Sequence, residues 1–351
     1  MKTNLFIAAL SLVVLAGCSS EDEIGTLVAK SDNAINFGTY VGKQTKAPVT
    51  SNSLPTNSSF GVFAYYTGQS GWEAVKTTIT PNFMYNQKVD YNGTTYTYSP
   101  LKYWPNTSGD QITFLAYYPH DDSEISFVES TDGTTKYSNA SQGLPKATFT
   151  VTKTTDQTDF MYSEVLTDKT STDGKISFTF KHALAQVNIQ AKMKEVLNDN
   201  TTVQIKSVSL KNILSSNTFT FGTNIWGTAE TATSYNTSVS DATPIEITKT
   251  DGVNAKNITS GESTFLMVPQ TLPTTVGSEA QIEIKYDVIT TDASLAGGKS
   301  TITNTVPLII SSLSLSIWGA NKKYLYTLEI SLSGVEVAAT VENWSTEEEA
   351  K

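Results

Sequence analysis

Several segments in the second half of the chain alternate apolar and polar residues one by one. They cover residues 176–181, 203–206, 245–248 and 282–286. Successive side chains of a strand point to opposite faces, so each segment predicts a strand with one buried and one solvated face. Turn residues separate the segments, which is typical of antiparallel sheets. Two such sheets packed face to face would bury the apolar sides, so we expect an all-β sandwich.

The first half of the chain contains strands of another kind. Residues 60–66 and 112–118 are runs rich in aromatic and β-branched residues, a composition that favours strands. A shorter strand is expected at residues 35–40, within an otherwise polar stretch that resembles a linker. These runs do not alternate as cleanly as the later segments.

The boundary between the two halves is predicted at a polar run that ends in the turn signal Asp173-Gly174. We therefore expect two antiparallel β-sandwich domains in tandem, at residues 48–172 and 173–351. Helical periodicity is weak throughout. The best helical candidate, residues 183–191, fits a strand equally well.

The end of the chain has the clearest pattern. Residues 324–331 predict a strand, and Ser333-Gly334 predicts a turn after it. The apolar residues that follow fall on one side of an extended chain, and we call them the apolar row: Val335, Val337, Ala339 and Val341. One interpretation is an ordinary hairpin, in which this row pairs with residues 324–331.

The charge of the chain excludes several kinds of partner. Among its 351 residues, Lys plus Arg total 24, every one of them a lysine, and the net charge is -10. Bidentate guanidinium contacts to phosphate are therefore impossible, and no basic surface offsets the charge of a polyanion. We expect no nucleic-acid partner. With two histidines and one cysteine, the chain offers little for metal or thiol chemistry, and we expect no cofactor.

The N-terminus has the form of a bacterial lipoprotein signal. Lys2 precedes an apolar stretch that suits export and is too short to span a bilayer. The residues that follow match a lipobox: Leu15, Ala16, Gly17 and Cys18. We expect residues 1–17 to be a signal peptide and the Cys18 thiol to carry the lipid, which would hold the protein to a membrane. An ordinary signal followed by a structural cysteine is the other interpretation.

Candidate catalytic groups are few. His120 and Asp121 nominally form an acid–base pair, but neighbours on an extended chain point to opposite faces, so we interpret them as part of a polar turn. The nearby carboxylates of Asp122 and Glu124 lack the spacing and the glycine of an EF-hand loop. His182 is expected to be a structural histidine with satisfied hydrogen bonds. We predict no catalytic residue and no metal site.

Aromatic residues suggest an alternative function. The chain contains five Trp and 16 Tyr. Large aromatic side chains in an all-β protein more often fill the core. If Trp72, Trp104, Trp226 or Trp318 were exposed, they would instead offer a surface for stacking against sugars. The alternative is therefore a monomeric surface lipoprotein that binds glycans through exposed aromatic residues.

Seven segments, taken in order, resemble the landmarks of the fimbrillin family of Bacteroidetes. They lie at residues 60–65, 101–105, 114–119, 159–162, 178–187, 268–270 and 341–344. The resemblance covers nearly the whole chain. It implies two transthyretin-like β-sandwich domains in a subunit or accessory protein of type V pili. It also implies export as a lipoprotein, removal of an N-terminal strand by a surface protease, and joining through a strand of a neighbouring subunit.

On this resemblance, residues 18–47 would be a lipid-anchored leader that contains the removable strand, Ile35 to Val41. Maturation in the family is often at arginine, which this chain lacks. We therefore expect cleavage at Lys43 or Lys46 by an enzyme that accepts lysine. Removal of the strand would expose unpaired backbone groups and an apolar groove, which a foreign strand can fill.

The apolar row is then the candidate donor strand, since alternating apolar side chains suit a groove of alternating pockets. The hairpin interpretation carries equal weight. Residues 345–351 are polar and acidic, whereas stalk pilins that resemble this family carry apolar residues there. This difference favours a tip, anchor or accessory position over the stalk.

The sequence as a whole predicts a structural or adhesive surface lipoprotein that is not an enzyme. The expected partners are other fimbrillin subunits, in a homo- or hetero-polymer, and the outer membrane through the lipid; the pattern identifies no host or bacterial receptor. Residues 19–23 resemble the acidic tract that directs Bacteroidetes lipoproteins to the cell surface, although a solvated charge run is the other interpretation. We expect a lipid-anchored protein on the outer membrane, or in the fimbrium after processing.

Overall fold

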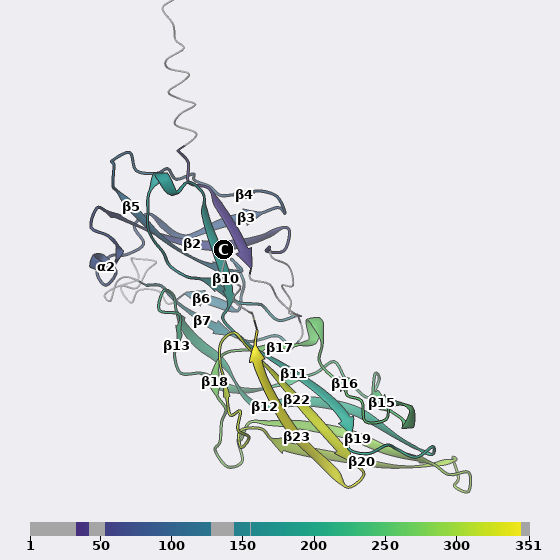
Figure 1. The fold of residues 1–351 in the computed structure, drawn as a ribbon. Coiled ribbons are helices and arrows are strands. Elements are labelled where there is room, and N and C mark those ends of the chain that lie inside the picture. Colours follow the sequence, from purple (N-terminus) through teal and green to yellow (C-terminus); the bar gives the residue numbers. More distant parts are fainter. Residues whose placement is uncertain (1–32, 42–52, 128–143, 155, 345–351) are drawn as a thin grey trace, which may run out of the picture.

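The structure, a computed structural model, describes residues 33–41, 53–127, 144–154 and 156–344. Almost all regular structure in these ranges is β-strand, which confirms the all-β prediction (Figure 1). The short helical elements within them are α2 (Trp72–Val75) and the 3-10 turns η1 (Ser171–Asp173), η2 (Lys249–Asp251) and η3 (Gly261–Ser263). No helix among the described residues has both the length and the apolar character to cross a membrane.

The first sheet has eight strands and contains most of the N-terminal half. In spatial order they are β1 (Phe37–Val41), β10 (Ile176–His182), β8 (Met161–Ser163), β5 (Gln111–Tyr118), β2 (Ser58–Gly68), β3 (Met84–Tyr91) and β4 (Tyr96–Thr97), with β9 (Leu166–Lys169) paired to β5. β2 is buried on both faces. Phe60 and Val62 enter one hydrophobic cluster, whereas Phe63 and Tyr65 enter another. Double burial explains why this strand has a continuous apolar run instead of an alternation.

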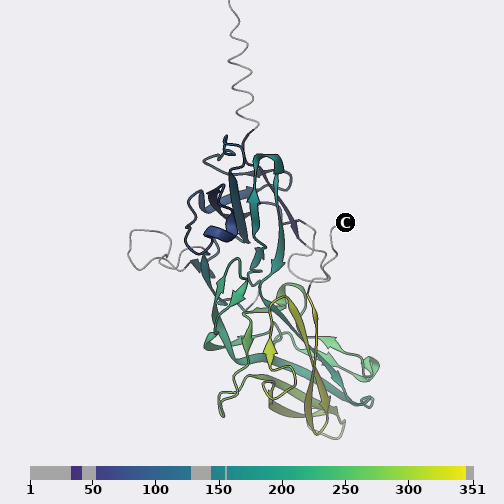
Figure 2. The ribbon, with the colours of Figure 1, turned by 60° about the vertical axis from the view of Figure 1, so that its left-hand side comes forward.

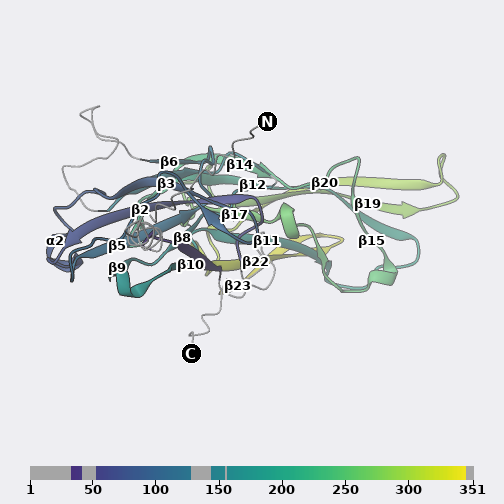
Figure 3. The ribbon, with the colours of Figure 1, turned by 90° about the horizontal axis from the view of Figure 1, so that it is seen from above.

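Two further sheets build the C-terminal half. One contains β20 (Lys299–Ile309), β19 (Gln281–Thr291), β12 (Thr201–Thr220), β7 (Lys146–Thr150) and β6 (Ile125–Phe127), with β13 (Ile225–Trp226), β14 (Glu230–Asn236) and β15 (Ile245–Ile247) also paired to β12. The other contains β16 (Lys256–Asn257), β11 (Ala185–Met193), β22 (Lys322–Ser331) and β23 (Gly334–Asn343), with β17 (Phe265–Met267) paired to β11. β18 (Gln270–Thr271) pairs with β21 (Ile317–Trp318). Seen from above in Figure 3, β12 and β20 lie along one side and β22 and β23 along the other.

The side chains between these two sheets form one core. Val203 and Ile284 come from one sheet, Ile189 and Tyr326 from the other, and all four are at most 2% exposed. The strands predicted from strict alternation are all present. Residues 183–191, which fitted either a helix or a strand, lie largely in strand β11.

Most strand pairs within the described ranges are antiparallel, as expected, but two are parallel. β1 runs parallel to β10, and β22 runs parallel to β11. Alternation of apolar and polar residues is the same in both arrangements, so the sequence pattern carried no signal for this difference.

Sheet membership crosses the boundary expected at residues 172 and 173 in both directions. β7 precedes this boundary and pairs with β12, whereas β10 follows it and pairs with β8. Aromatic rings fill the junction of the two halves: Phe160 lies 5.4 Å from Phe149 and 5.7 Å from Phe219, measured between ring centroids. The two halves follow one another along the long axis of the molecule (Figure 2). Their division into two transthyretin-like domains stays a prediction.

Candidate functional site

The predicted removable strand is a buried part of the N-terminal half. Ile35, Phe37 and Val41 point inward and are 0–3% exposed, whereas Tyr40 points outward and is 42% exposed. Thr39, in the same inward row, bonds through its hydroxyl to the Tyr96 hydroxyl at 2.7 Å. We call Ile35, Phe37, Thr39 and Val41 the inward row. An alternation of this kind turns four successive side chains of one face toward the core.

Phe37 is the centre of an aromatic cluster. Its ring lies 5.8 Å from Phe178, stacked, and 6.3 Å from Phe60, edge to face. Phe114 and Tyr98 complete its surroundings, with centroids at 6.2 and 5.2 Å. Aromatic pairs at such distances contribute more than their buried area alone. The Phe37 side chain therefore fills a pocket made by three strands and the loop that carries Tyr98.

The backbone of this segment bonds on two sides. From Phe37 to Val41 it pairs with β10 in parallel register, with Val41 beside Phe180. Just before β1, the Ile35 amide donates to the Lys102 carbonyl at 2.9 Å, and the Trp104 amide donates to Asn33 at 3.0 Å. Removing residues 33–41 would leave donors and acceptors without partners along both borders, which is unfavourable in a buried place.

A half-buried tyrosine also holds this segment. The Tyr98 hydroxyl donates to the Ile35 carbonyl at 2.8 Å. Burial raises the pKa of Tyr98 above its ordinary value, so the phenol stays a protonated donor at neutral pH.

The apolar row at the other end of the chain lies in β23, the outer strand of its sheet. β23 pairs antiparallel with β22, so in this single chain the hairpin interpretation holds. Val335, Val337 and Ala339 pack against the core but are only partly buried, and Val341 is 44% exposed. Whether the strand is also donated to another subunit stays a prediction.

The end of β23 is fixed by a buried stack. The Trp344 ring lies parallel to the His182 ring, with centroids 3.9 Å apart, and the Trp344 amide donates to the Asn321 carbonyl at 2.9 Å. His182 Nδ1 lies 2.7 Å from Asp159 Oδ1. Full satisfaction of His182 was expected, but its Nε2 has no partner among the described residues.

Several predicted site residues lie outside the part of the chain that the structure describes. They are the lipobox residues Leu15, Ala16 and Gly17, the lipidation residue Cys18, and the processing candidates Lys43 and Lys46.

The acidic residues near His120 have structural partners. The expectation that His120 and Asp121 diverge is wrong: His120 Nδ1 lies 2.7 Å from Asp121 Oδ1, because Asp121 has a left-handed backbone with φ of 61°. Glu124 is buried, and its Oε1 accepts bonds from the Thr152 and Lys153 amides at 2.6 and 3.1 Å. The Glu124 carboxylate therefore already accepts hydrogen bonds from backbone amides. Among the described residues, no group of three or more His, Cys, Asp or Glu is placed to hold a metal ion.

The tryptophans considered for sugar stacking do not form an exposed surface. Trp72, Trp104 and Trp318 are 1–4% exposed, so they fill the core, as large aromatic residues in an all-β protein more often do, and they do not meet the condition of the alternative function. Trp226 is half-buried, and its indole N–H donates to the Ala183 carbonyl at 2.8 Å. Each ring contributes more by filling the core than it could by standing in water.

Known proteins resemble this chain along its length. The Fimbrium subunit Fim1C of Phocaeicola vulgatus is 25% identical over 383 aligned residues, which cover 100% of this chain and 98% of that protein. The Putative fimbrium subunit Fim1C of Bacteroides uniformis is 23% identical, with coverage of 98% and 95%. A crystal structure of a fimbrial protein from Bacteroides vulgatus has a TM-score of 0.69 and 25% identity, and the match covers 89% of this chain and 99% of that one.

A more distant solved structure shares the fold. It is a putative cell adhesion protein from Bacteroides ovatus, with a TM-score of 0.50 and 13% identity over 90% of this chain and 99% of that one. The family model for fimbrillin-like proteins matches residues 45–344, which include most of the strands described above. The chain belongs to the fimbrillin-like family.

Proposed function

We propose that this protein is a structural subunit of a surface fimbria, assembled by strand exchange after proteolysis. It would reach the outer membrane as a lipoprotein through Cys18, and its partners would be other fimbrillin subunits. Relatives along the whole chain are called fimbrium subunits, which supports this role. The role is mechanical and adhesive, and it requires no catalytic site.

The observation that carries the proposal is the burial of Ile35, Phe37 and Val41. A short segment near the start of the described chain supplies an inward row to the core, and the candidate cleavage residues Lys43 and Lys46 follow it directly. Cleavage there would leave the segment attached only by non-covalent contacts. Its departure would open an apolar groove between β10 and residues 102–104, lined by the aromatic partners of Phe37.

The donor in this proposal is β23 of another subunit. Its apolar row has the same period of two as the inward row that it would replace. In its own subunit the side chains of the apolar row are only partly buried. Transfer into the closed groove of a neighbouring subunit would therefore bury more apolar area. At about 25 cal/mol per Å2, four such side chains would gain several kcal/mol before the ordering of the strand is subtracted.

Two features at the end of the chain support a particular position in the fimbria. In the single chain the stack of Trp344 on His182 holds β23 in place, so donation of β23 would require this stack to open. Residues 345–351 are polar and acidic and would add little apolar contact in a neighbouring groove. Both features favour a tip, anchor or accessory subunit over a stalk subunit.

The donor role is tested with charges on β23. Val337→Asp combined with Val341→Asp should abolish any SDS-resistant ladder of surface protein, while the monomer is still secreted. Ala338→Asp combined with Thr340→Asp adds the same charges to the opposite face of the strand and should leave the ladder intact. A ladder that is unchanged in the first variant would overturn the donor assignment.

The processing step has a separate test. Mass spectrometry of surface protein should find chains that begin just after Lys43 or Lys46, and the double change of both lysines to Gln should abolish them. Lys30→Gln, upstream of the strand, is the matched control and should change nothing. If every surface chain still begins at Cys18, the subunit is not processed.

A further inference from the structure

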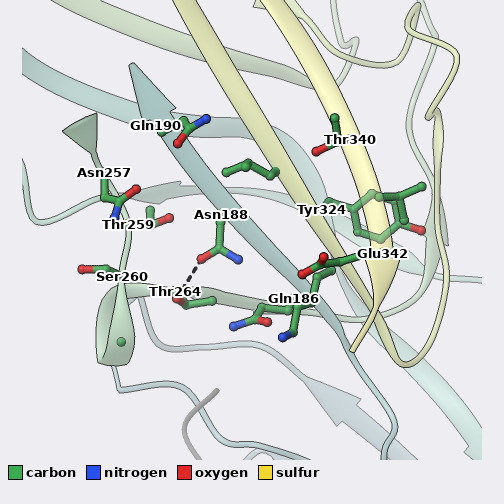
Figure 4. A pocket seen from close by; sticks show the side chains of 14 residues that line it. Gln186, Asn188, Gln190, Asn257, Thr259, Ser260, Thr264, Tyr324, Thr340 and Glu342 are labelled. Carbon is green, nitrogen blue, oxygen red and sulfur yellow. Dashed lines mark hydrogen bonds between the residues drawn. The ribbon is translucent and has the colours of Figure 1, made fainter. Parts of the chain in front are cut away.

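A groove with a volume of about 560 Å3 lies on the outer face of the sheet of β11, β22 and β23 (Figure 4). Its floor is the solvent side of β11 and β22. One wall is the segment of residues 257–264, and the other is β23. The volume falls within the range of small-molecule sites, about 300–1,000 Å3. The strand-exchange proposal makes no use of this groove.

The floor combines amide groups with an apolar patch. Along β11, Val187 and Ile189 are buried in the core, so Asn188 and Gln190 point to the outer face, roughly 7 Å apart. The parallel register places Asn188 beside Leu325 of β22. A neighbouring apolar side chain gives the floor a surface against which a C–H face can pack.

The two amides have hydrogen-bonding capacity left. The Thr264 hydroxyl donates to Asn188 Oδ1 at 3.0 Å, and the side-chain nitrogen of Asn188 is turned away from Thr264 (Figure 4). Gln190 Nε2 donates to the Thr327 hydroxyl at 2.9 Å, so its Oε1 can still accept. The groove thus offers a donor and an acceptor on the same face of β11. Sugar hydroxyls, each of which donates and accepts, can satisfy both.

The wall is fastened to the floor by backbone hydrogen bonds. The Ile258 and Thr259 amides both donate to the Ile189 carbonyl, at 2.9 and 3.1 Å. In return, the Ile189 amide donates to the Thr259 hydroxyl at 2.8 Å. A wall already held in place reduces the entropy lost when a ligand binds.

The charges around the groove balance. Lys323 and Glu342 line it and stand opposite each other in the pairing of β22 with β23. Farther along the same face, Lys192 and Glu329 form an ion pair at 2.9 Å. Among the lining side chains that the structure describes, one cation and one anion are present, so this lining suits a neutral polar ligand.

We propose that this groove binds a neutral saccharide of one or two pyranose rings. Leu325 would pack against the C–H face of a ring, while Asn188 and Gln190 would bond its hydroxyls. Thr340, which faces Leu325 across the β22–β23 pair, belongs to β23. If strand exchange occurs as proposed above, only a subunit that keeps its own β23 would have a complete groove.

The test is ligand-observed NMR on the full chain in a sugar-free detergent. The probes are methyl glycosides of glucose, galactose, mannose and N-acetylglucosamine and their disaccharides, with sialyllactose as an anionic probe. At least one neutral probe should bind, and Asn188→Ala with Gln190→Ala should weaken it at least tenfold. Thr340→Trp should block the groove and abolish binding.

The control is Gln204→Ala, which removes an amide from the outer face of the opposite sheet, where it bonds to Glu246. It should leave binding unchanged, and all variants should keep the parent melting temperature within a few degrees. Binding of none of the neutral probes, or binding that survives Thr340→Trp, would overturn the proposal. The SDS-resistant ladder does not depend on Asn188 or Gln190, so such a failure would leave strand exchange standing.

Discussion

Residues 35–41 and β23 have the same pattern and different surroundings. Each places four successive side chains of one strand face toward the interior. In the first segment Ile35, Phe37 and Val41 are 0–3% exposed, whereas in β23 Val341 is 44% exposed and its neighbours in the row are only partly buried. The same alternation therefore occurs in two settings. Residues 35–41 complete one hydrophobic core, whereas β23 covers only the edge of another.

The difference comes from what borders each strand. Residues 33–41 have backbone partners on two sides, in β10 and in residues 102–104. Among the described residues, β1 and β23 are both outer strands of their sheets, each with one strand partner, β10 and β22. Only the first segment has further backbone partners, because the residues just before β1 also bond to residues 102–104. An edge strand keeps unpaired backbone groups that another chain can bond. The comparison shows that the first segment is enclosed by the core and by an extra backbone partner, whereas β23 is held by β22 and covers the core only in part.

The largest effect is expected at the centre of the inward row. Phe37→Ala should lower the free energy of unfolding by about 3–5 kcal/mol, because it empties a pocket lined by four rings. Tyr40→Ala, on the exposed face of the same strand, should cost under about 0.5 kcal/mol. Chemical denaturation of the uncleaved chain measures both. Equal effects would mean that residues 35–41 do not fill a groove.

A smaller loss is expected where β23 is fastened. Trp344→Ala should cost about 3 kcal/mol, at the lower end for a buried aromatic, because the residue lies at the end of a strand. It should also speed hydrogen exchange at β23 amides more than at β11 amides. Trp344→Phe keeps a ring over His182 and should recover much of the protection. Unchanged exchange in β23 would show that the stack does not hold the strand.

Within the apolar row, truncation should matter less than in the inward row. Val337→Ala removes two methyl groups from a half-buried site and should cost roughly 1 kcal/mol. Glu336→Ala, the neighbour on the exposed face, breaks only an exposed ion pair with Lys194 and should cost less. A loss at Val337 as large as that at Phe37 would remove the distinction between the two strands.

An effect of similar size to that at Val337 is expected for one hydrogen bond of the inward row. Tyr96→Phe removes the partner of the Thr39 hydroxyl and should cost about 0.5–1.5 kcal/mol. Thr39→Val in the Tyr96→Phe background should then cost almost nothing further. A double-mutant cycle by denaturation measures this coupling, and additive losses would show that the bond does not stabilise β1.

The candidate site could be predicted from the sequence in part. The spacing of Ile35, Phe37 and Val41 marks a strand with an apolar face, and the alternation from Val335 to Val341 marks another. Nothing in the spacing showed that the inward row meets Phe60, Phe114 and Phe178, because these residues are distant along the chain. The amide groove on β11 was also missed, since Asn188 and Gln190 resemble any solvated strand face. The loop that turns this face into a groove is fixed by backbone bonds that leave no mark in the sequence.

The sequence by itself determined which segments are strands and which of their faces are apolar, because side-chain alternation is a local property of an extended chain. It also carried the signal-like N-terminus and the lack of arginine. The tertiary structure alone decided that β1 runs parallel to β10 and β22 parallel to β11, and that the pairings of β7 and β10 cross the expected boundary. It also decided that the inward row is mostly buried, whereas the apolar row is only partly buried. Pairing direction and burial depend on which distant strands come together, so the alternation of side chains predicts neither of them.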